Sequence, residues 1–179
     1  QVAAGIIISE ANAGVTEGGS SDIYTVRLAS RPAADVTLDI SSGGQVTASP
    51  DPLIFTPSNW SVEQTVTLTA VDDDVDEGAH GDTVAHNAAS TDVAYDDFTI
   101  GSVTVTITDN DVAGVQTSAA SVDVSEGGAT GNYTIVLTSE PTADVIVTPT
   151  GNLQCTVSGP LTFTSADWDT PQPVVVTAI

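Results

Sequence analysis

The stretch YTVRLASRPAADVTLDI, residues 24–40, decides the fold of this chain. Apolar side chains occupy every second position in residues 24–28, and they do so again in residues 36–40. Alternation of period two, rich in Val and Thr, is typical of strands with one buried face. The intervening SRPAAD contains the small, proline and aspartate residues that favour a turn. This stretch therefore predicts two strands joined by a tight connection.

The same pattern extends outward on both sides. Residues 66–70 and 103–107 alternate in the same way, and EGGSSD, SSGG, SPDP and DEGAHGD are turn signals between the alternating segments. No segment carries an apolar stripe of helical period. The predicted strands cover residues 5–9, 22–29, 35–40, 52–56, 62–71, 82–89 and 100–108. Strands at this spacing predict an all-β fold, an immunoglobulin-like antiparallel β-sandwich.

The sequence also repeats itself. GIIIS at Gly5 and GVQTS at Gly114 begin segments 109 residues apart, and YTIVLTSEPTADV (residues 133–145) repeats the deciding stretch. FTPSNW (residues 55–60) meets FTSADW (residues 163–168) after a one-residue deletion. A repeat of this size corresponds to one domain. We therefore predict tandem sandwiches: residues 1–112 form a complete one, and residues 113–179 form a second, incomplete one that lacks its last strands.

Composition excludes several classes of partner. The chain carries 24 Asp plus Glu against 2 Arg and no Lys, for a net charge of −22. Nucleic acids and anionic membranes attract basic surfaces, so neither is an expected partner. No apolar run reaches the roughly 20 residues of a membrane span, which argues against membrane insertion. The single Cys155 cannot form an intramolecular disulfide, and its repeat counterpart Val46 predicts a buried thiol.

Acidic residues from segments far apart in sequence are expected to meet. If successive strands run up and down, the first turn, the loop after residues 62–71 and the end of residues 100–108 share one end of the first sandwich. Both arginines map to the other end, and Asp51 could join the acidic end through the loop that contains it. The predicted metal ligands are Glu17, Asp72, Asp73, Asp74, Asp76, Glu77, Asp109, Asn110 and Asp111.

A divalent cation would relieve the repulsion between these carboxylates, which is about 1 kcal/mol per close pair even in water. Calcium takes six to eight oxygen ligands, whereas magnesium retains waters and zinc prefers nitrogen or sulfur. The expected cofactor is therefore Ca²⁺. Two alternatives to a bound cation stay open: a solvated acidic loop, and adaptation to high salt, which predicts acids spread over every surface.

Three motifs together resemble the Calx-beta domain: VTEGG (residues 15–19), TAVDDDVDEG (residues 69–78) and VTVTITDND (residues 103–111). The resemblance implies calcium bound by Glu17, Asp72, Asp73, Glu77 and residues 109–111. It also implies a module of tandem arrays in bacterial surface or secreted proteins, and hence an extracellular or cell-surface location. SSGGQVTASPDPLIF (residues 41–55) departs from the family pattern, which leaves the number of ions open.

The remaining candidate sites are weaker. We interpret His80 and His86 as ordinary surface and strand residues, and Trp60 and Trp168 as caps on the two cores. The acidic loop that contains Asp92, Tyr95, Asp96 and Asp97 is expected to be solvated, with a minor cation site as the alternative. No nucleophile motif or phosphate loop is present in the sequence, so no enzymatic activity is expected.

Three hypotheses of function remain from the sequence. The first is a calcium-binding structural repeat of a large extracellular adhesin-like protein, with calcium stiffening the domain junction and with neighbouring repeats or chains as partners. The second is a ligand-binding or carbohydrate-binding accessory module, although only 4% of the residues are aromatic. The third is a non-catalytic part of a secreted enzyme.

Overall fold

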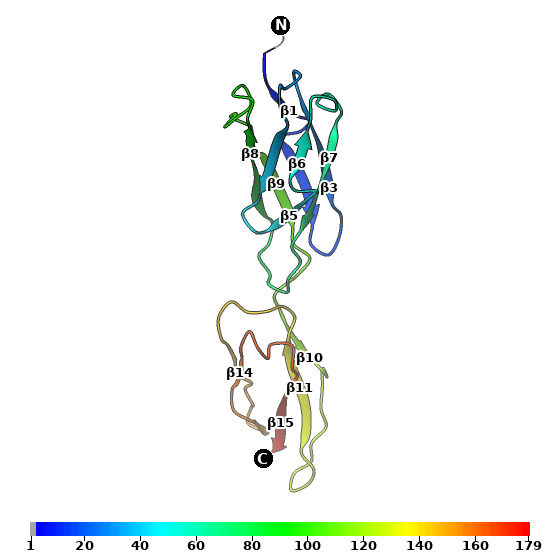
Figure 1. Ribbon diagram of the computed structural model, residues 1–179. Coiled ribbons are helices and arrows are strands. Elements are labelled where there is room, and N and C mark those ends of the chain that lie inside the picture. Colours follow the sequence, from blue (N-terminus) through cyan, green and yellow to red (C-terminus); the bar gives the residue numbers. More distant parts are fainter. Residues whose placement is uncertain (1–2) are drawn as a thin grey trace. The chain divides into compact units, whose positions relative to one another are not determined.

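A computed structural model describes residues 3–179, and all of its regular structure is β (Figure 1). The chain divides into two compact units. The first unit contains residues 1–73 and 79–110, and the second contains residues 74–78 and 111–179. Within residues 3–179 no helix is long and apolar enough to cross a membrane.

The first unit is a sandwich of two sheets. One sheet has the order β1–β3–β7–β5, formed by β1 (Ile6–Ile8), β3 (Asp22–Leu28), β7 (Gln64–Ala70) and β5 (Val46–Ser49), with all neighbours antiparallel. The other has the order β2–β9–β8–β4–β6, formed by β2 (Asn12–Thr16), β9 (Val103–Thr108), β8 (His80–Ser90), β4 (Val36–Ser41) and β6 (Leu53–Phe55). Its pairs are antiparallel except β2 and β9, which run parallel.

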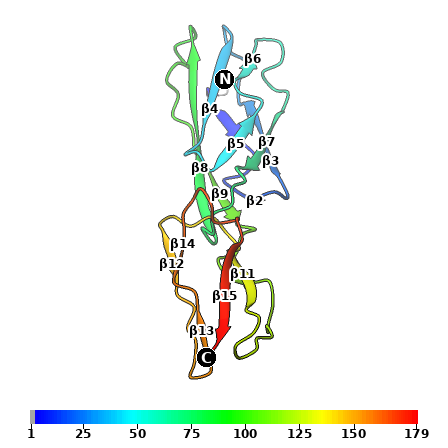
Figure 2. The same cartoon turned by 90° about the horizontal axis from the view of Figure 1, so that it is seen from below.

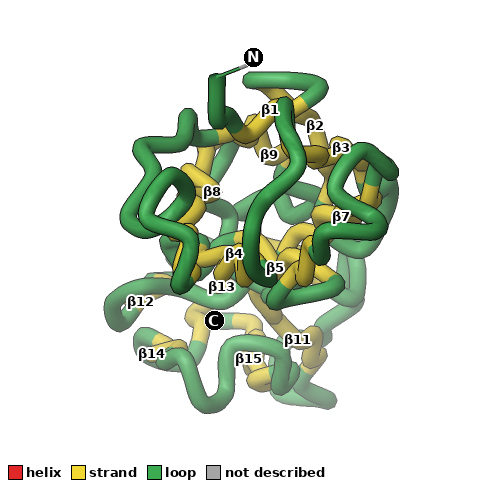
Figure 3. The backbone as a smooth tube through the Cα atoms, turned by 45° about the horizontal axis from the view of Figure 1, so that its top comes forward, coloured by secondary structure: helices red, strands yellow, loops and turns green. Residues whose placement is uncertain are grey.

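The predicted alternation builds the core between these sheets. In β9 every second residue is buried and the others are exposed, and β4 and β7 keep their apolar positions buried in the same way. Trp60 packs against this core, as its position before β7 predicts. The strands surround the interior in the view of Figure 3. The prediction of an all-β sandwich is therefore confirmed.

Two strands are absent from the prediction. β2 and β5 lie in segments that are predicted to be loops, and β8 begins two residues before its predicted start. β2 contains Asn12 and Gly14, which have low strand propensity, so only its pairing with β9 makes it a strand. β5 has four residues, which is too short for alternation to be recognised. Both segments are strands because they pair with distant strands, β2 with β9 and β5 with β7.

The second unit repeats six of these strands (Figure 2). One sheet has the order β10–β11–β15–β13, formed by β10 (Val115–Thr117), β11 (Gly131–Leu137), β15 (Gln172–Ala178) and β13 (Cys155–Val157). The other contains only β12 (Val145–Val147) and β14 (Leu161–Phe163). These six occupy the positions of β1, β3, β7, β5, β4 and β6, so counterparts of β2, β8 and β9 do not occur among the described residues.

Fewer strands cover the second core. Ile135, Leu137, Phe163 and Val174 form its buried core cluster, and Trp168 packs against them. Cys155 is half-buried, whereas its counterpart Val46 is 2% exposed, so the prediction of a fully buried thiol is wrong. The reason is that the sheet facing β13 has two strands rather than five.

Candidate metal centre

Glu17 lies in a tight turn at one end of the first sandwich. The Thr16 amide donates to the Ser20 carbonyl at 3.0 Å, and Gly18 adopts a left-handed φ of 57°, which glycine reaches without steric cost. The Glu17 amide donates to the Thr108 carbonyl at 3.0 Å, which fixes the turn to the end of β9. The turn buries the Glu17 side chain, which is 2% exposed.

Two further segments reach the same turn. A Cβ added to Gly18 would lie 3.0 Å from Asn110 Nδ2 and 3.2 Å from Asp72 Oδ1, so the turn packs directly against both side chains. Asn110 Nδ2 also donates to Asp72 Oδ1 at 3.1 Å. The turn after β2, the end of β7 and the end of β9 therefore meet, as the alternation of strand directions predicts.

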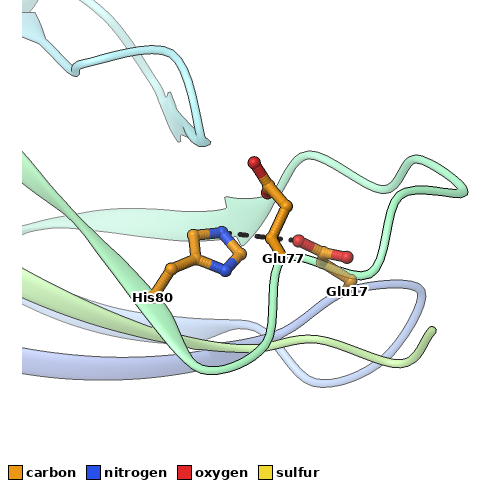
Figure 4. A group of neighbouring side chains, drawn as sticks. All are labelled: Glu17, Glu77 and His80. Carbon is orange, nitrogen blue, oxygen red and sulfur yellow. Dashed lines mark ion pairs between the residues drawn. The ribbon is translucent and has the colours of Figure 1, made fainter. Parts of the chain in front are cut away.

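His80, the first residue of β8, faces Glu17 (Figure 4). Its Nε2 lies 3.5 Å from Glu17 Oε1, and its side chain is 17% exposed. The interpretation of His80 as an ordinary surface residue is wrong, because β8 begins at the acidic end and directs its first side chain inward. The acidic turn immediately before it in the sequence is the signal that could have revealed this.

Two groups of potential ligand atoms share Glu17. Atoms of Glu17, Glu77 and His80 lie within 4.8 Å of one another, and so do atoms of Glu17, Asp109 and Asp111. Both groups could hold a metal ion. The second group offers only carboxylate oxygens, the donors that calcium prefers, whereas the first adds an imidazole nitrogen that suits softer ions.

Some of the predicted ligands belong to the two ligand groups, some lie beside the Glu17 turn, and others lie outside both groups. Glu17, Glu77, Asp109 and Asp111 belong to the groups, and Asp72 and Asn110 lie against the turn. The neighbouring Asp73 is exposed and belongs to neither group. Asp74 and Asp76 belong to neither group either. The Asp74 carbonyl accepts from the Glu140 amide at 2.6 Å, and Asp76 Oδ2 accepts from the Ala113 amide at 2.7 Å.

Asp51, which could have joined the acidic end, makes a hydrogen bond away from that end. Its Oδ1 accepts a hydrogen bond from the Ile40 amide at 2.8 Å. β5 carries the chain away from the acidic end before Asp51 is reached, because Val46 pairs with Ala70 and Ser49 with Thr67. The expectation that Asp51 joins the cluster is therefore wrong, and the missing β5 in the prediction explains the error.

The two arginines do not neutralise the acidic end. Arg27 Nε lies 3.8 Å from Glu63 Oε1, and Arg31 Nε donates to the Pro57 carbonyl at 2.9 Å. Arg27 is near the end of β3, whereas the acidic end lies where β3 begins. The chain contains no third Arg and no Lys.

Several carboxylates away from this end have structural roles. Burial would raise the pKa of Asp82, but hydrogen bonds from the amides of Thr83, Gly43, Gln45 and Val46 lower it below its ordinary value. Hydrogen bonds from the Gly14 and Ile23 amides lower the pKa of Asp22 in the same way. These side chains accept backbone hydrogen bonds that hold loops in place, and they lie outside both ligand groups.

The acidic loop between β8 and β9 is also structural. Tyr95 is 1% exposed and its hydroxyl donates to the Ser30 carbonyl at 2.6 Å. Hydrogen bonds from the Ala33 and Ala94 amides lower the pKa of Asp92. The prediction that this loop is solvated is wrong for Tyr95, whereas Asp92 is half-buried and Asp96 and Asp97 are exposed.

The second unit has no equivalent centre among its described residues. Glu126, the repeat counterpart of Glu17, is exposed, and no group of three potential ligands includes it. Its turn has no partner equivalent to β9. This outcome agrees with the absence of β8 and β9 counterparts.

Comparisons with known proteins give distant likenesses only. No protein-family model and no curated protein matches the chain. The calcium binding domain CBD12 of CALX1.1 is 16% identical with a TM-score of 0.45, over 96% of this chain and 78% of that one. The apo-form Calx CBD1 domain is 18% identical with a TM-score of 0.44, over 59% and 98%.

A third solved structure is the CsuC–CsuE chaperone–tip adhesion subunit pre-assembly complex from the Csu pili of Acinetobacter baumannii. It is 9% identical with a TM-score of 0.44, over 98% of this chain and 87% of that one. Such values assign neither a family nor a function. The β-sandwich architecture rests on the strand pairing of the chain itself.

Proposed function

We propose that this chain is a calcium-binding structural repeat module of a large extracellular or cell-surface, adhesin-like protein, without enzymatic activity. Neighbouring repeats or neighbouring chains are its proposed partners. Calcium bound at Asp109 and Asp111 would restrict the covalent link between β9 and β10, on which both residues lie. The resemblance of three sequence motifs to Calx-beta domains supports the same function.

The observation that carries the proposal is the burial of Glu17. A carboxylate removed from water loses several kcal/mol of solvation, and it needs a compensating positive charge or strong hydrogen bonds. Glu17 is 2% exposed at the end of the sandwich where Asp72, Asp109 and Asp111 also gather. A bound cation would add positive charge there beside the His80 imidazole, whereas the two arginines lie at the other end of the sandwich.

The donor set fits calcium. Glu17, Asp109 and Asp111 supply carboxylate oxygens, and Asp72, Glu77 and Asn110 offer further oxygens at the same end. Calcium accepts such mixtures together with water. When bound, the ion would supply the charge that allows these carboxylates to approach one another. His80 leaves a softer ion as the competing occupant, which the experiment below separates.

No specific observation favours the carbohydrate-binding alternative. Trp60 and Trp168, the two tryptophans that could stack on a sugar, pack against the two hydrophobic cores. Their main-chain carbonyls accept equivalent hydrogen bonds, from the Leu28 amide at 2.9 Å and from the Leu137 amide at 3.1 Å. Both side chains therefore have structural positions.

Isothermal titration calorimetry of the full chain tests the proposal. We expect calcium to bind the wild type, Glu17→Gln to weaken binding at least about tenfold by removing one ligand charge, and Glu126→Gln to bind as the wild type does. Glu126 is the matched control because it occupies the same repeat position but is exposed.

Two results would contradict the proposal. One is equal calcium binding by the Glu17→Gln and wild-type chains, which would indicate diffuse attraction by a surface of charge −22. The other is zinc binding that His80→Gln abolishes in a chain that does not bind calcium. That result would assign the first ligand group to a softer ion.

A further inference from the structure

β1 is an edge strand of the first sandwich, and β3 is its one neighbour among the described residues. Just beyond β1, the Ser9 amide donates to the Thr25 carbonyl at 2.9 Å. Because hydrogen-bonded and non-hydrogen-bonded pairs alternate between antiparallel strands, Ile6 and Ile8 fall in non-hydrogen-bonded positions. Their amides and carbonyls therefore point away from β3, toward the open edge of the sheet.

The other edge strands of this sandwich, β2, β5 and β6, have side chains bonded to their backbones. Asp22 accepts from the Gly14 amide of β2 at 2.9 Å, Asp82 accepts from the Val46 amide of β5 at 3.1 Å, and Gln64 Nε2 donates to the Ile54 carbonyl of β6 at 2.8 Å. Among the described residues no side chain bonds to Ile6 or Ile8 in this way. Open edges recruit further strands, so β1 is the edge of this sandwich that is prepared for one.

An open groove of about 240 Å³ lies beside the edge of β1. Its lining residues are Ile6, Ile8, Glu10, Ala11, Gly101 and Ser102. The two isoleucines are half-buried and pack against the hydrophobic core. A Cβ added to Gly101 would meet no heavy atom within 4 Å, so there is free space above this residue. The groove can therefore receive apolar side chains of a strand that pairs with β1.

Glu10 gives the groove its charge. It is exposed, and no hydrogen bond or ion pair of its carboxylate occurs among the described residues. The net charge of −22 adds to its attraction for a basic group and to its repulsion of an acidic one. The chain does not supply a matching basic strand itself, because Arg27 lies within β3 and Arg31 Nε donates to the Pro57 carbonyl.

We propose that the open edge of β1 binds an extended segment of another protein, with apolar residues at alternate positions and a lysine or arginine at one end. The segment pairs antiparallel with β1, since that pairing is the more stable per residue. Its apolar side chains enter the groove beside Ile6 and Ile8, and its basic residue faces Glu10. The repeat counterpart β10 is also the edge strand of its sheet, although the first repeat precedes it. The open edge therefore belongs to the repeat itself.

The full chain and the peptide Lys-Thr-Val-Thr-Val-Thr test this proposal. In an antiparallel pair the lysine lies toward Glu10 and the valines lie beside Ile8 and Ile6. We expect saturable binding that slows amide hydrogen exchange at Ile6 and Ile8, measured by NMR. The amide of Ile7, which occupies a hydrogen-bonded position opposite β3, should change little. Replacement of both valines by serine should weaken binding at least about tenfold, because the burial of two apolar side chains is lost.

Two substitutions in the chain locate the binding site. Gly101→Leu places a side chain in the groove and should weaken binding at least about tenfold, because the leucine takes the space of a valine. Gly159→Leu in the second unit is the matched control, since an added Cβ meets nothing within 4 Å there either. Glu10→Gln should weaken binding about two- to fivefold, as expected for an exposed ion pair. A peptide with glutamine in place of its lysine should not distinguish Glu10→Gln from the wild type.

Three outcomes would overturn the proposal. One is equal binding by the Gly101→Leu and Gly159→Leu chains. Another is equal binding of the valine and serine peptides, which would indicate attraction of the lysine by net charge alone. The third is protection of Ile6 and Ile8 that rises with chain concentration without peptide, which would make a second copy the occupant. If Gly101→Leu lowers the melting temperature, the comparison of the two peptides decides. All measurements include a chelator, so that they do not depend on the metal centre.

Discussion

The hydroxyl of Tyr24 lies 2.8 Å from Nε2 of His86 and joins the two sheets of the first sandwich. Tyr24 belongs to β3 and His86 to β8, and their rings meet edge to face at 5.5 Å. His86 Nδ1 lies 3.0 Å from the Gly101 carbonyl oxygen. A carbonyl only accepts, so Nδ1 carries the proton, and Nε2 of the neutral ring accepts from the Tyr24 hydroxyl.

This arrangement predicts a loss of stability in mild acid. Burial lowers the pKa of His86 below its ordinary 6.5, although the Gly101 carbonyl acts in the opposite direction. The unfolded chain therefore binds a proton before the folded one does, and the stabilisation present above pH 6.5 falls as the pH decreases through the folded-state pKa. Urea unfolding at pH 8, 6.5 and 5 should show this decrease.

A His86→Gln chain is the control for that measurement. It should lose less free energy of unfolding between pH 6.5 and 5 than the wild type does. The lowered pKa of Asp82 acts only below its ordinary 3.8, outside this window. Parallel losses in the two chains would show that His86 is not responsible.

Calcium should stabilise the folded chain against heat. A ligand that binds only the folded state at a hundredfold excess over its Kd contributes about 2.7 kcal/mol. Asp109→Ala should remove most of that gain, whereas Asp35→Ala should keep it, because Asp35 directly precedes β4 and belongs to neither ligand group. Melting temperatures with calcium and with chelator measure the difference. Equal losses in both variants would indicate charge screening rather than a site.

Matched core substitutions should affect the two units unequally. Val36 is fully buried, whereas its counterpart Val145 is half-buried. Val36→Ala should cost about 2–3 kcal/mol, from two lost methyl groups and the space they leave. Val145→Ala should cost less than about 1 kcal/mol, because much of its surface is already in contact with water. Hydrogen exchange followed separately in β3 and β11 measures both, and equal costs would contradict the assigned burial.

The sequence predicts those parts of the fold in which local pattern and pairing agree. β3, β4, β7 and β9 alternate strictly and lie where expected. β2 does not alternate in a recognisable way, and it becomes a strand only because β9 offers a free parallel edge. That information lies in residues 103–108, roughly ninety positions away along the chain.

In the candidate site, too, some features follow from the strand pattern and others depend on tertiary contacts. Strand direction alone brings Glu17 toward Asp109 and Asp111, so the sequence is enough to predict that they meet. The path of residues 72–77 is decided by individual loop hydrogen bonds, which no periodicity encodes. Asp74 and Asp76 lie outside both ligand groups, and their place in the site stays a prediction. His80 was missed because its role depends on the residue at which β8 begins.

The parallel pairing of β2 with β9 gives the first sandwich a mechanical property. A force that stretches the chain would pull β2 toward its first residue and β9 toward its last residue. Because the two strands run parallel, these two pulls point in opposite directions along the strand pair. Five residue pairs, from Asn12 with Thr104 to Thr16 with Thr108, then carry the load together in shear. Antiparallel neighbours loaded in this way would instead separate one pair at a time. The Glu17 amide, bonded to the Thr108 carbonyl, adds a further link at the loaded end of β9.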